Sequence, residues 1–153
     1  MVSQAELHEL KPEELHKFWP LLRRGVNDIK RKCKPNWVPE DIYSAIRTAQ
    51  VNCVISLRGE RFLGFVIYSK QLRIFNYLPE LFVWLAWNLP VREWLADDDM
   101  PAAVTQVWQY IANVARTQYQ TDQITWITPP GRARAFSRRF GWRAAWVTMT
   151  AKV

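Results

Sequence analysis

The sequence predicts an α+β fold in which helices flank a mixed, mostly antiparallel sheet. Two apolar, β-rich segments at residues 51–58 and 61–68 are separated by a two-residue turn, which is typical of an antiparallel hairpin. A long helical segment lies between an apolar strand at 81–87 and a short strand at 124–128, which indicates one parallel crossover. The complete predicted order is β-α-α-β-β-β-α-β-α-β.

The first third of the chain predicts a short edge strand and two helices. The strand covers residues 6–10, and Pro12 with two acidic neighbours opens the first helix. Apolar residues at three- and four-residue steps give this helix one buried face. They are Leu15, Phe18, Leu22, Val26 and Ile29. We expect Pro20 and Gly25 to kink or divide the helix, and Pro39 to start the next one.

The remaining elements follow from apolar periodicity and from turn residues. The strand at 81–87 is apolar on both faces, so it should be central in the sheet. The long helix opens at Met100, and a short basic helix covers residues 132–140 after the next strand. Gly141 ends that helix, and residues 142–153 alternate as a final strand does. A chain of 153 residues suits one domain, which we expect to span 1–153.

The net charge of +7 comes from 21 Lys+Arg and 14 Asp+Glu, and it is unevenly distributed. The first helix carries Arg23, Arg24, Lys30, Arg31, Lys32 and Lys34, and the last helix region carries Arg132, Arg134, Arg138, Arg139 and Arg143. The acidic cluster consists of Glu93, Asp97, Asp98 and Asp99. Such segregation favours a polyanion or an acidic partner surface, although two solvated helix faces explain it equally well.

Nine tryptophans are more than the core of a small domain usually buries. We interpret Trp84, Trp108 and Trp126 as core residues. Trp87 and Trp94 are predicted to contribute a contact surface, because Trp is favoured where proteins bind one another.

Several classes of site and location are excluded by absent patterns. Cys33 and Cys53 have no C-x-x-C spacing, so we expect two inert thiols. His8 and His16 lie on different predicted elements without a third ligand, so we expect no metal site. No apolar run approaches the roughly 18 residues needed to span a bilayer, and the start of the chain is unlike a signal peptide. We expect no membrane partner and a cytoplasmic location, or the virion if the chain is phage-encoded.

The predicted order of elements resembles the GNAT (Gcn5-related N-acetyltransferase) fold over essentially the whole chain. Many GNAT proteins carry Asn-x-x-Ala-x-x-Phe-Tyr-x-x-x-Gly-Phe on the helix beside the acyl-CoA. The matching positions here are Ala133, Phe136, Gly141 and Trp142. The functional positions differ, because Pro130 replaces the Asn, and Ser137 replaces the Tyr that usually protonates the CoA thiolate. A serine hydroxyl is far less acidic than a phenol with its pKa of about 10.

The resemblance also implies where an acyl-CoA diphosphate should bind. GNAT enzymes hold it on glycine-rich backbone N–H groups between the fourth strand and the following helix. The corresponding segment here, residues 87–103, has no glycine, contains two prolines and carries Asp97, Asp98 and Asp99. We expect these aspartates to cap the helix and repel a diphosphate, so that ordinary CoA binding is disfavoured.

Three functions remain from the sequence. The first is a GNAT-like binding or assembly protein without a cofactor, resembling GNAT-like proteins of tailed-phage morphogenesis regions, with a protein partner or homo-oligomer. Its contact residues would be Arg23, Arg24, Lys30, Arg31, Lys32, Trp87, Trp94, Arg138 and Arg139. The alternative is an acetyl-CoA-dependent N-acetyltransferase in which Arg92, Arg132 and Arg134 bind CoA, and Glu80 and Ser137 serve the chemistry. The third is nucleic-acid binding through the two basic segments.

Overall fold

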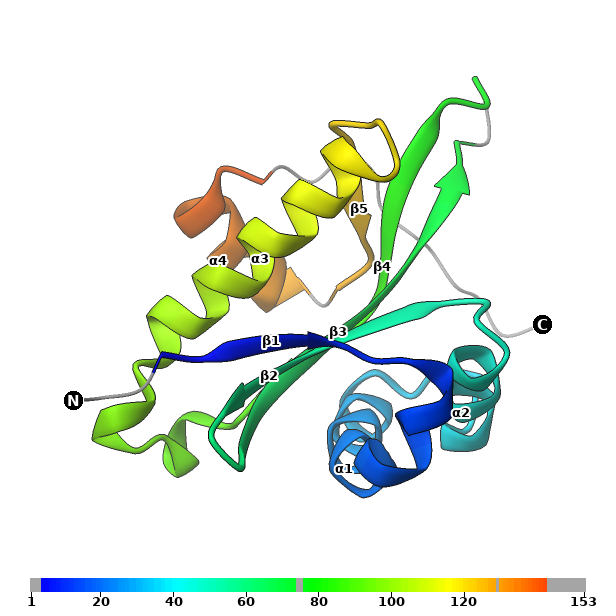
Figure 1. The fold of residues 1–153 in the computed structure, drawn as a ribbon. Coiled ribbons are helices and arrows are strands. Elements are labelled where there is room, and N and C mark those ends of the chain that lie inside the picture. The colour runs from blue at the N-terminus through cyan, green and yellow to red at the C-terminus, as the bar shows by residue number, and fades with distance from the viewer. Residues whose placement is uncertain (1–3, 74–75, 129, 143–153) are drawn as a thin grey trace.

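The computed structural model describes residues 4–73, 76–128 and 130–142, and its centre is a five-stranded sheet in the order β1-β2-β3-β4-β5 (Figure 1). The strands are β1 (Glu6–Glu9), β2 (Asn52–Arg58), β3 (Arg61–Leu72), β4 (Pro79–Asn88) and β5 (Ile124–Trp126). Neighbours from β1 to β4 are antiparallel, and β4 with β5 is parallel. The predicted α+β class, hairpin and parallel crossover are therefore confirmed.

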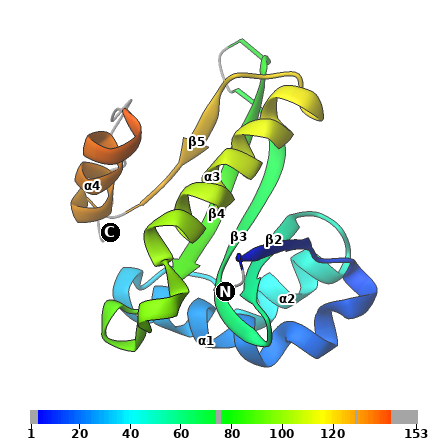
Figure 2. The same ribbon diagram turned by 60° about the vertical axis from the view of Figure 1, so that its left-hand side comes forward.

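Helices cover both faces of this sheet. Helices α1 (Leu15–Cys33) and α2 (Pro39–Arg47) pack on one face, and α3 (Met100–Thr117) packs on the other (Figures 1 and 2). Helix α4 (Pro130–Phe140) lies beside β5 and α3. Each face has its own apolar core, because side chains of successive strand residues alternate between the two faces.

The first core lies between the sheet and α1 with α2. Its largest side chains include Leu15, Leu22, Phe62, Phe65 and Trp87. The second core lies between the sheet and α3. Its members include Val54, Val66, Tyr68, Leu81, Val83, Trp108 and Ile111.

Helix α1 is one uninterrupted segment, so the prediction that Pro20 and Gly25 divide it is wrong. A short 3₁₀ turn, Pro12–Glu14, precedes it. Gly25 is buried, and a Cβ there would lie 2.4 Å from Cε1 of Phe65 and 2.8 Å from the indole of Trp87. The glycine therefore allows α1 to approach the sheet closely, and packing outweighs its low helix propensity.

The two halves of the hairpin agree with the predicted strands, with Gly59 in the turn at a φ of 61°. β3 continues to Leu72, four residues beyond the predicted end, while β5 stops at Trp126. The predicted last strand, 142–153, lies outside the described residues from 143 on. Among the helices that are described, none is both long and apolar enough to cross a membrane.

Candidate functional site

The candidate site begins at a β-bulge in β4. Ile67 of β3 pairs with Leu85, and the next residue, Tyr68, pairs with Val83, so Trp84 is an extra residue in β4. Bulges bend a strand and re-aim its side chains, and they are common beside functional sites. The bulge also marks the end of the parallel ladder, because pairing between β4 and β5 extends only to Val83.

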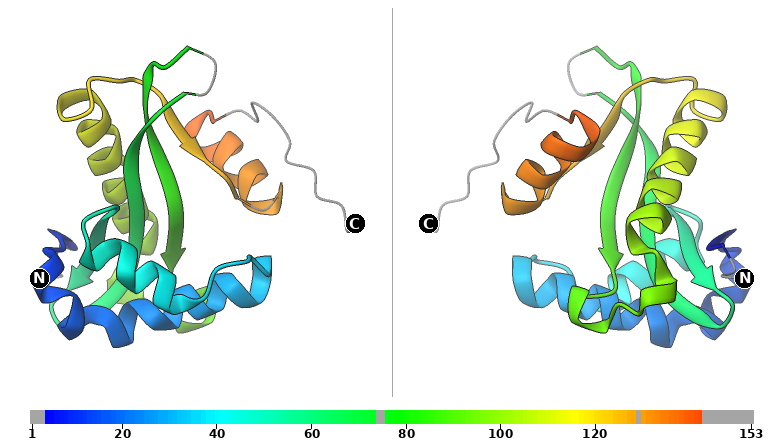
Figure 3. Two further views of the ribbon diagram at one scale, coloured as in Figure 1. Left: turned by 90° about the vertical axis from the view of Figure 1, so that its right-hand side faces the viewer. Right: turned by 90° about the vertical axis from the view of Figure 1, so that its left-hand side faces the viewer.

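Beyond the bulge, β4 and β5 separate. In Figures 2 and 3, β5 turns away while β4 continues towards α3. Residues 84–88 of β4 lie beside β3 along one edge. Along their other edge, no strand in the described ranges pairs with them. This edge leaves backbone hydrogen-bonding groups of β4 available to a side chain or a ligand.

One arginine of α4 already uses this edge. Nη1 of Arg132 donates a hydrogen bond to the Ala86 carbonyl at 3.3 Å, and its guanidinium lies 6.0 Å from the ring centre of Trp126. Although the side chain is partly exposed, burial lowers the pKa of Arg132. Arg132 therefore contacts β4 at this edge, and its predicted role in binding CoA stays a prediction.

An aromatic cluster attaches α4 to the rest of the fold. Phe136 contacts Trp126, Trp108 and Trp142, with ring centres 4.8, 5.0 and 5.6 Å away. Mostly edge-to-face geometry of this kind adds to the stabilisation from burial. Two positions of the GNAT-like motif, Phe136 and Trp142, are therefore packing positions, and Trp108 is a core residue as predicted.

The acidic segment between β4 and α3 is arranged differently from the prediction. Asp98 is only 1% exposed and forms an ion pair with Arg61, whose Nε and Nη2 donate to the carboxylate at 2.8 and 3.0 Å. The backbone N–H of Leu95 donates to the same carboxylate at 2.8 Å. Arg61 also donates to the Glu93 carbonyl at 2.7 Å, so this one guanidinium orders the loop.

Asp98 therefore points into the protein and does not cap α3. Burial raises the pKa of Asp98, but the hydrogen bonds from Arg61 and Leu95 and the charge of Arg61 lower it by more. The pKa of this carboxyl group is therefore below its ordinary value. Asp99 occupies the N-cap position with a φ of 43° and makes no side-chain hydrogen bond to the helix. The expectation that these aspartates cap α3 is wrong: the Asp98 carboxylate binds Arg61 and the Leu95 N–H, and Asp99 makes no capping hydrogen bond.

The first turn of α3 is consequently uncapped and lies next to cationic side chains. Nη2 of Arg139, from α4, donates to the Pro101 carbonyl and, at 2.9 Å, to Oγ1 of Thr105. A pocket of about 340 Å³ lies on the other side of this turn, lined in part by Ala102 and Ala103. An uncapped helix N-terminus with nearby guanidinium groups attracts anions.

The residues predicted to serve the chemistry lie on different elements, Glu80 on β4 and Ser137 on α4. Oε2 of Glu80 accepts a hydrogen bond from Oγ1 of Thr125 at 2.8 Å, where β4 and β5 are still paired. Ser137 is exposed on α4, and Arg92 and Arg134 are exposed as well. Within the described part of the chain, no hydrogen bond links Glu80 with Ser137, and no three metal-ligating side chains form a group.

The predicted contact residues divide between surface and core. Trp87 is only 4% exposed and packs on Phe62 and Phe65, so its assignment to a contact surface is wrong. Conversely Trp84, predicted in the core, is 44% exposed because of the bulge, and its Nε1 donates to Oγ of Ser69. Trp94 is 38% exposed, and its predicted part in a contact surface stays a prediction.

The basic side chains of α1 are partly neutralised. Arg24 forms an ion pair with Glu93 and lies 5.4 Å from the ring centre of Trp87, and Arg31 pairs with Asp28. Other cations predicted at a contact surface are solvent-accessible: Arg23, Lys32 and Arg138 are exposed, and Lys30 is half-buried. Arg61 was missed in the sequence because its partner Asp98 is 37 residues away.

Comparison with known proteins identifies the fold. A scan against protein-family models and a search of curated protein sequences found no match. Among solved structures, a ribosomal-protein-alanine N-acetyltransferase from Brucella melitensis biovar Abortus 2308 is similar, with a TM-score of 0.69, 14% identity, and coverage of 97% of this chain and 99% of that one. AAC(6')-Iy in complex with the bisubstrate analogue CoA-S-monomethyl-acetylneamine is also similar. Its TM-score is 0.70, its sequence identity is 14%, and the match covers 99% of each chain.

A third similar structure is a possible acetyltransferase from Clostridium difficile 630, with a TM-score of 0.66, 7% identity, and coverage of 99% of each chain. At these identities the likeness concerns the backbone alone. This chain therefore has a GNAT-like fold: an α+β structure in which helices flank a five-stranded, mostly antiparallel sheet.

Proposed function

We propose that this chain acts, as one GNAT-like domain, as an acyl-CoA-dependent N-acyltransferase whose diphosphate site lacks the usual glycines. The observation that carries the proposal is the opening of the β4–β5 pair at the Trp84 bulge, together with the uncapped first turn of α3 that follows the loop 89–99. An extended thioester ligand could hydrogen-bond to the free β4 edge while its phosphates meet the positive end of the α3 dipole.

Arginine side chains take the place of glycine-rich backbone in this proposal. Asp98 is neutralised by Arg61, so the loop is less repulsive than its three consecutive aspartates indicate. Arg139 touches the first turn of α3, and Arg92 is exposed in the loop. Guanidinium groups bind phosphate oxygens in a bidentate manner, so they can offset the missing backbone donors.

The proposed chemistry relies on positioning. The amine nitrogen attacks the thioester carbonyl carbon, the C–S bond breaks, and the amine loses a proton while the CoA thiolate gains one. Holding the two reactants together supplies a large part of such a rate enhancement. Ser137 stands in the position of the usual tyrosine, and Glu80 is hydrogen-bonded to Thr125. Solvent would therefore accept the proton from the amine and supply the proton to the thiolate, and we expect a modest rate.

Isothermal titration with acetyl-CoA tests the proposal, with Arg139→Gln and the matched control Arg138→Gln. Arg139 contacts α3 and Arg138 is exposed on the same helix, so only Arg139→Gln should weaken binding. Ligand at 100 times its dissociation constant should stabilise the wild type by about 2.7 kcal/mol. Release of free thiol with a panel of amines then measures transfer. No heat and no change in Tm at millimolar acetyl-CoA would exclude the proposal.

A binding or assembly role is a second candidate, favoured by exposed apolar side chains. On the β3–β4 hairpin, Leu72, Tyr77 and Leu78 are 59%, 74% and 51% exposed, and Val91 and Leu95 are 72% and 59% exposed in the loop before α3. This candidate includes a virion or morphogenesis role, which is inferred from the sequence alone. A stable oligomer or hetero-complex on light scattering, with no acetyl-CoA binding, would support it over the enzyme.

A further inference from the structure

The two basic segments of the chain meet at the free edge of β4. Ala86 and Trp87 are consecutive residues beyond the point where β5 separates from β4. Nε1 of Trp87 donates a hydrogen bond to Oδ2 of Asp28, in α1, at 3.1 Å. The Ala86 carbonyl accepts the hydrogen bond from Arg132, in α4. Figure 3 shows the C-terminal end of α1 and the whole of α4 on the same side of β4, although the two helices are far apart in the sequence.

The end of α1 lies close to the same arginine. Burial lowers the pKa of Arg132, and the group that opposes this shift is Cys33, the last residue of α1. Lys32 is exposed next to Cys33, and it lies one helical turn after Asp28, which the indole of Trp87 contacts. Lys32 and Arg132 therefore flank the same edge of β4, one from each helix.

The positive charge at this edge is not balanced within the protein. In the described ranges, the ion pairs of α1 involve Arg24 and Arg31, and no ion pair involves Lys32 or Arg132. Asp28, the acidic residue nearest to Lys32 in the sequence, already pairs with Arg31. Helix α4 contains no acidic residue, and the residues outside the described ranges include neither Asp nor Glu. An excess of positive charge therefore remains beside β4.

This charge selects among the amines that could approach the β4 edge. Fixed positive charge attracts anions and repels cations over about one Debye length, roughly 10 Å at 0.1 M salt. We propose that the acceptor amine belongs to an acidic peptide, whose carboxylates meet Lys32 and Arg132 while its N-terminal amine reaches the thioester. This inference rests on the acyltransferase function proposed above and adds the class of its acceptor. Polycationic amines are expected to be poor acceptors.

The chemistry of the transfer favours a peptide over other polyanions. The amine nitrogen forms the new amide bond as the thioester C–S bond breaks, and solvent takes the amine proton and returns one to the thiolate. This attack requires the free electron pair of an aliphatic amine, whereas the amino groups of nucleobases share theirs with the ring. Arginine also binds a carboxylate through two parallel hydrogen bonds. Because Arg132 is partly buried, solvent screens this attraction less than it screens a fully exposed pair.

Peptide binding without acetyl-CoA tests the charged surface directly. The probe is a peptide of one alanine followed by four glutamates, compared by isothermal titration with a peptide in which lysines replace the glutamates. The acidic peptide should bind more tightly, and its affinity should fall as salt rises from about 0.05 M to about 0.5 M. Lys32→Gln and Arg132→Gln should each weaken its binding about two- to fivefold, the effect of one partly screened charge. Equal affinity of the wild type for both peptides would overturn the proposal.

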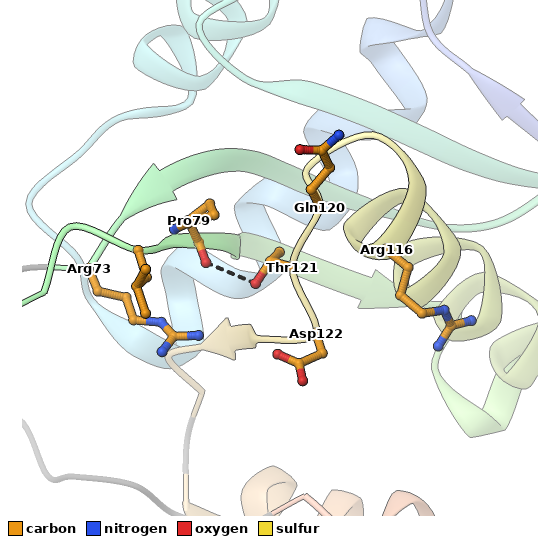
Figure 4. Close-up of a pocket in the computed structure, with 7 residues that line it drawn as sticks. Arg73, Pro79, Arg116, Gln120, Thr121 and Asp122 are labelled. Carbon is orange, nitrogen blue, oxygen red and sulfur yellow. Dashed lines mark hydrogen bonds between the residues drawn. The ribbon is translucent and has the colours of Figure 1, made fainter.

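The matched controls are Lys17→Gln and Arg116→Gln. Lys17 is exposed near the start of α1, roughly 22 Å along the helix axis from Lys32. Arg116 is exposed in the last turn of α3, beside a pocket of about 440 Å³ that Arg73, Asp122 and Pro79, the first residue of β4, also line. Figure 4 shows its guanidinium directed away from Arg73 and Asp122. Each control removes one positive charge elsewhere on the chain, so equal losses in all four variants would overturn a local site.

Transfer assays separate failure of this inference from failure of the acyltransferase. If acetyl-CoA binds and the lysine peptide is acylated as fast as the acidic peptide, the acceptor class is overturned and the enzyme stands. If the acidic peptide binds with the expected losses but acetyl-CoA does not bind, the acyltransferase is overturned and the acidic-peptide site is supported. A single-stranded oligonucleotide that binds more tightly than the acidic peptide would overturn the peptide in favour of a nucleic acid. Amide chemical shifts of residues 30–34 and 84–88 give a readout in the wild type alone, in case Arg132→Gln fails to fold.

Discussion

Asp98→Ala offers the sharpest test of how the loop before α3 is built. The substitution removes three hydrogen bonds to a carboxylate, two from Arg61 and one from the Leu95 N–H. Breaking a fully buried ion pair costs about 3–5 kcal/mol, but the Arg61 side chain is 34% exposed and can regain water. We therefore expect a loss of about 2–4 kcal/mol of unfolding free energy, against less than about 0.5 kcal/mol for the exposed neighbour Asp97→Ala.

Urea denaturation at pH 7 and at pH 3 measures both variants. The folded-state pKa of Asp98 lies below its ordinary value, so its contribution is complete above about pH 4 and is lost as the pH falls through the folded pKa. The difference between wild type and Asp98→Ala should accordingly shrink at the lower pH. Equal stability of Asp98→Ala and Asp97→Ala at pH 7 would refute a structural role for the ion pair.

Three further predictions concern the core and the edge of the sheet. Gly25→Ala should lower the unfolding free energy by about 1–3 kcal/mol, because the added Cβ would overlap aromatic rings of the sheet. Helix propensity alone predicts a gain in unfolding free energy, so urea denaturation distinguishes the two effects. Trp108→Ala should cost about 3–5 kcal/mol on the same assay, and the half-exposed Trp84→Ala clearly less. Burial, together with the hydrogen bond to Glu9 and its charge, raises the pKa of Tyr110 to about 12. Its stabilisation is then complete below about pH 10 and lost towards about pH 12, so unfolding free energies of Tyr110→Phe should fall less steeply over that range.

Local sequence signals predicted most of the backbone. Pro12 and Pro39 stand near the starts of helical segments, and Gly59 lies at a φ that favours glycine, so propensity and structure agree there. Errors arose where packing outweighed propensity, as in the uninterrupted α1. Gly25 looked like a helix breaker in the sequence, yet it is the residue that lets α1 approach Phe65 and Trp87.

The candidate site was harder to predict, because it depends on register and on distant pairs. A single extra residue at Trp84 reverses the alternation of β4, which exposes Trp84 and buries Trp87. No pattern within a strand reveals such a bulge, since it is defined only by the partner strand. The same holds for the pocket beyond α3, where Arg73, Arg116 and Asp122 come from three separate segments.

The sequence by itself determined the α+β class, the antiparallel hairpin, the parallel crossover and the absence of a glycine-rich loop, because these depend on neighbouring residues along the chain. Only the tertiary structure decided how the acidic loop is neutralised, where β4 and β5 separate, and which tryptophans are buried. The physical reason is that charges and aromatic rings act through space. The partner of Asp98 is Arg61, 37 residues away, and Asp99 at the N-cap of α3 makes no side-chain hydrogen bond to the helix.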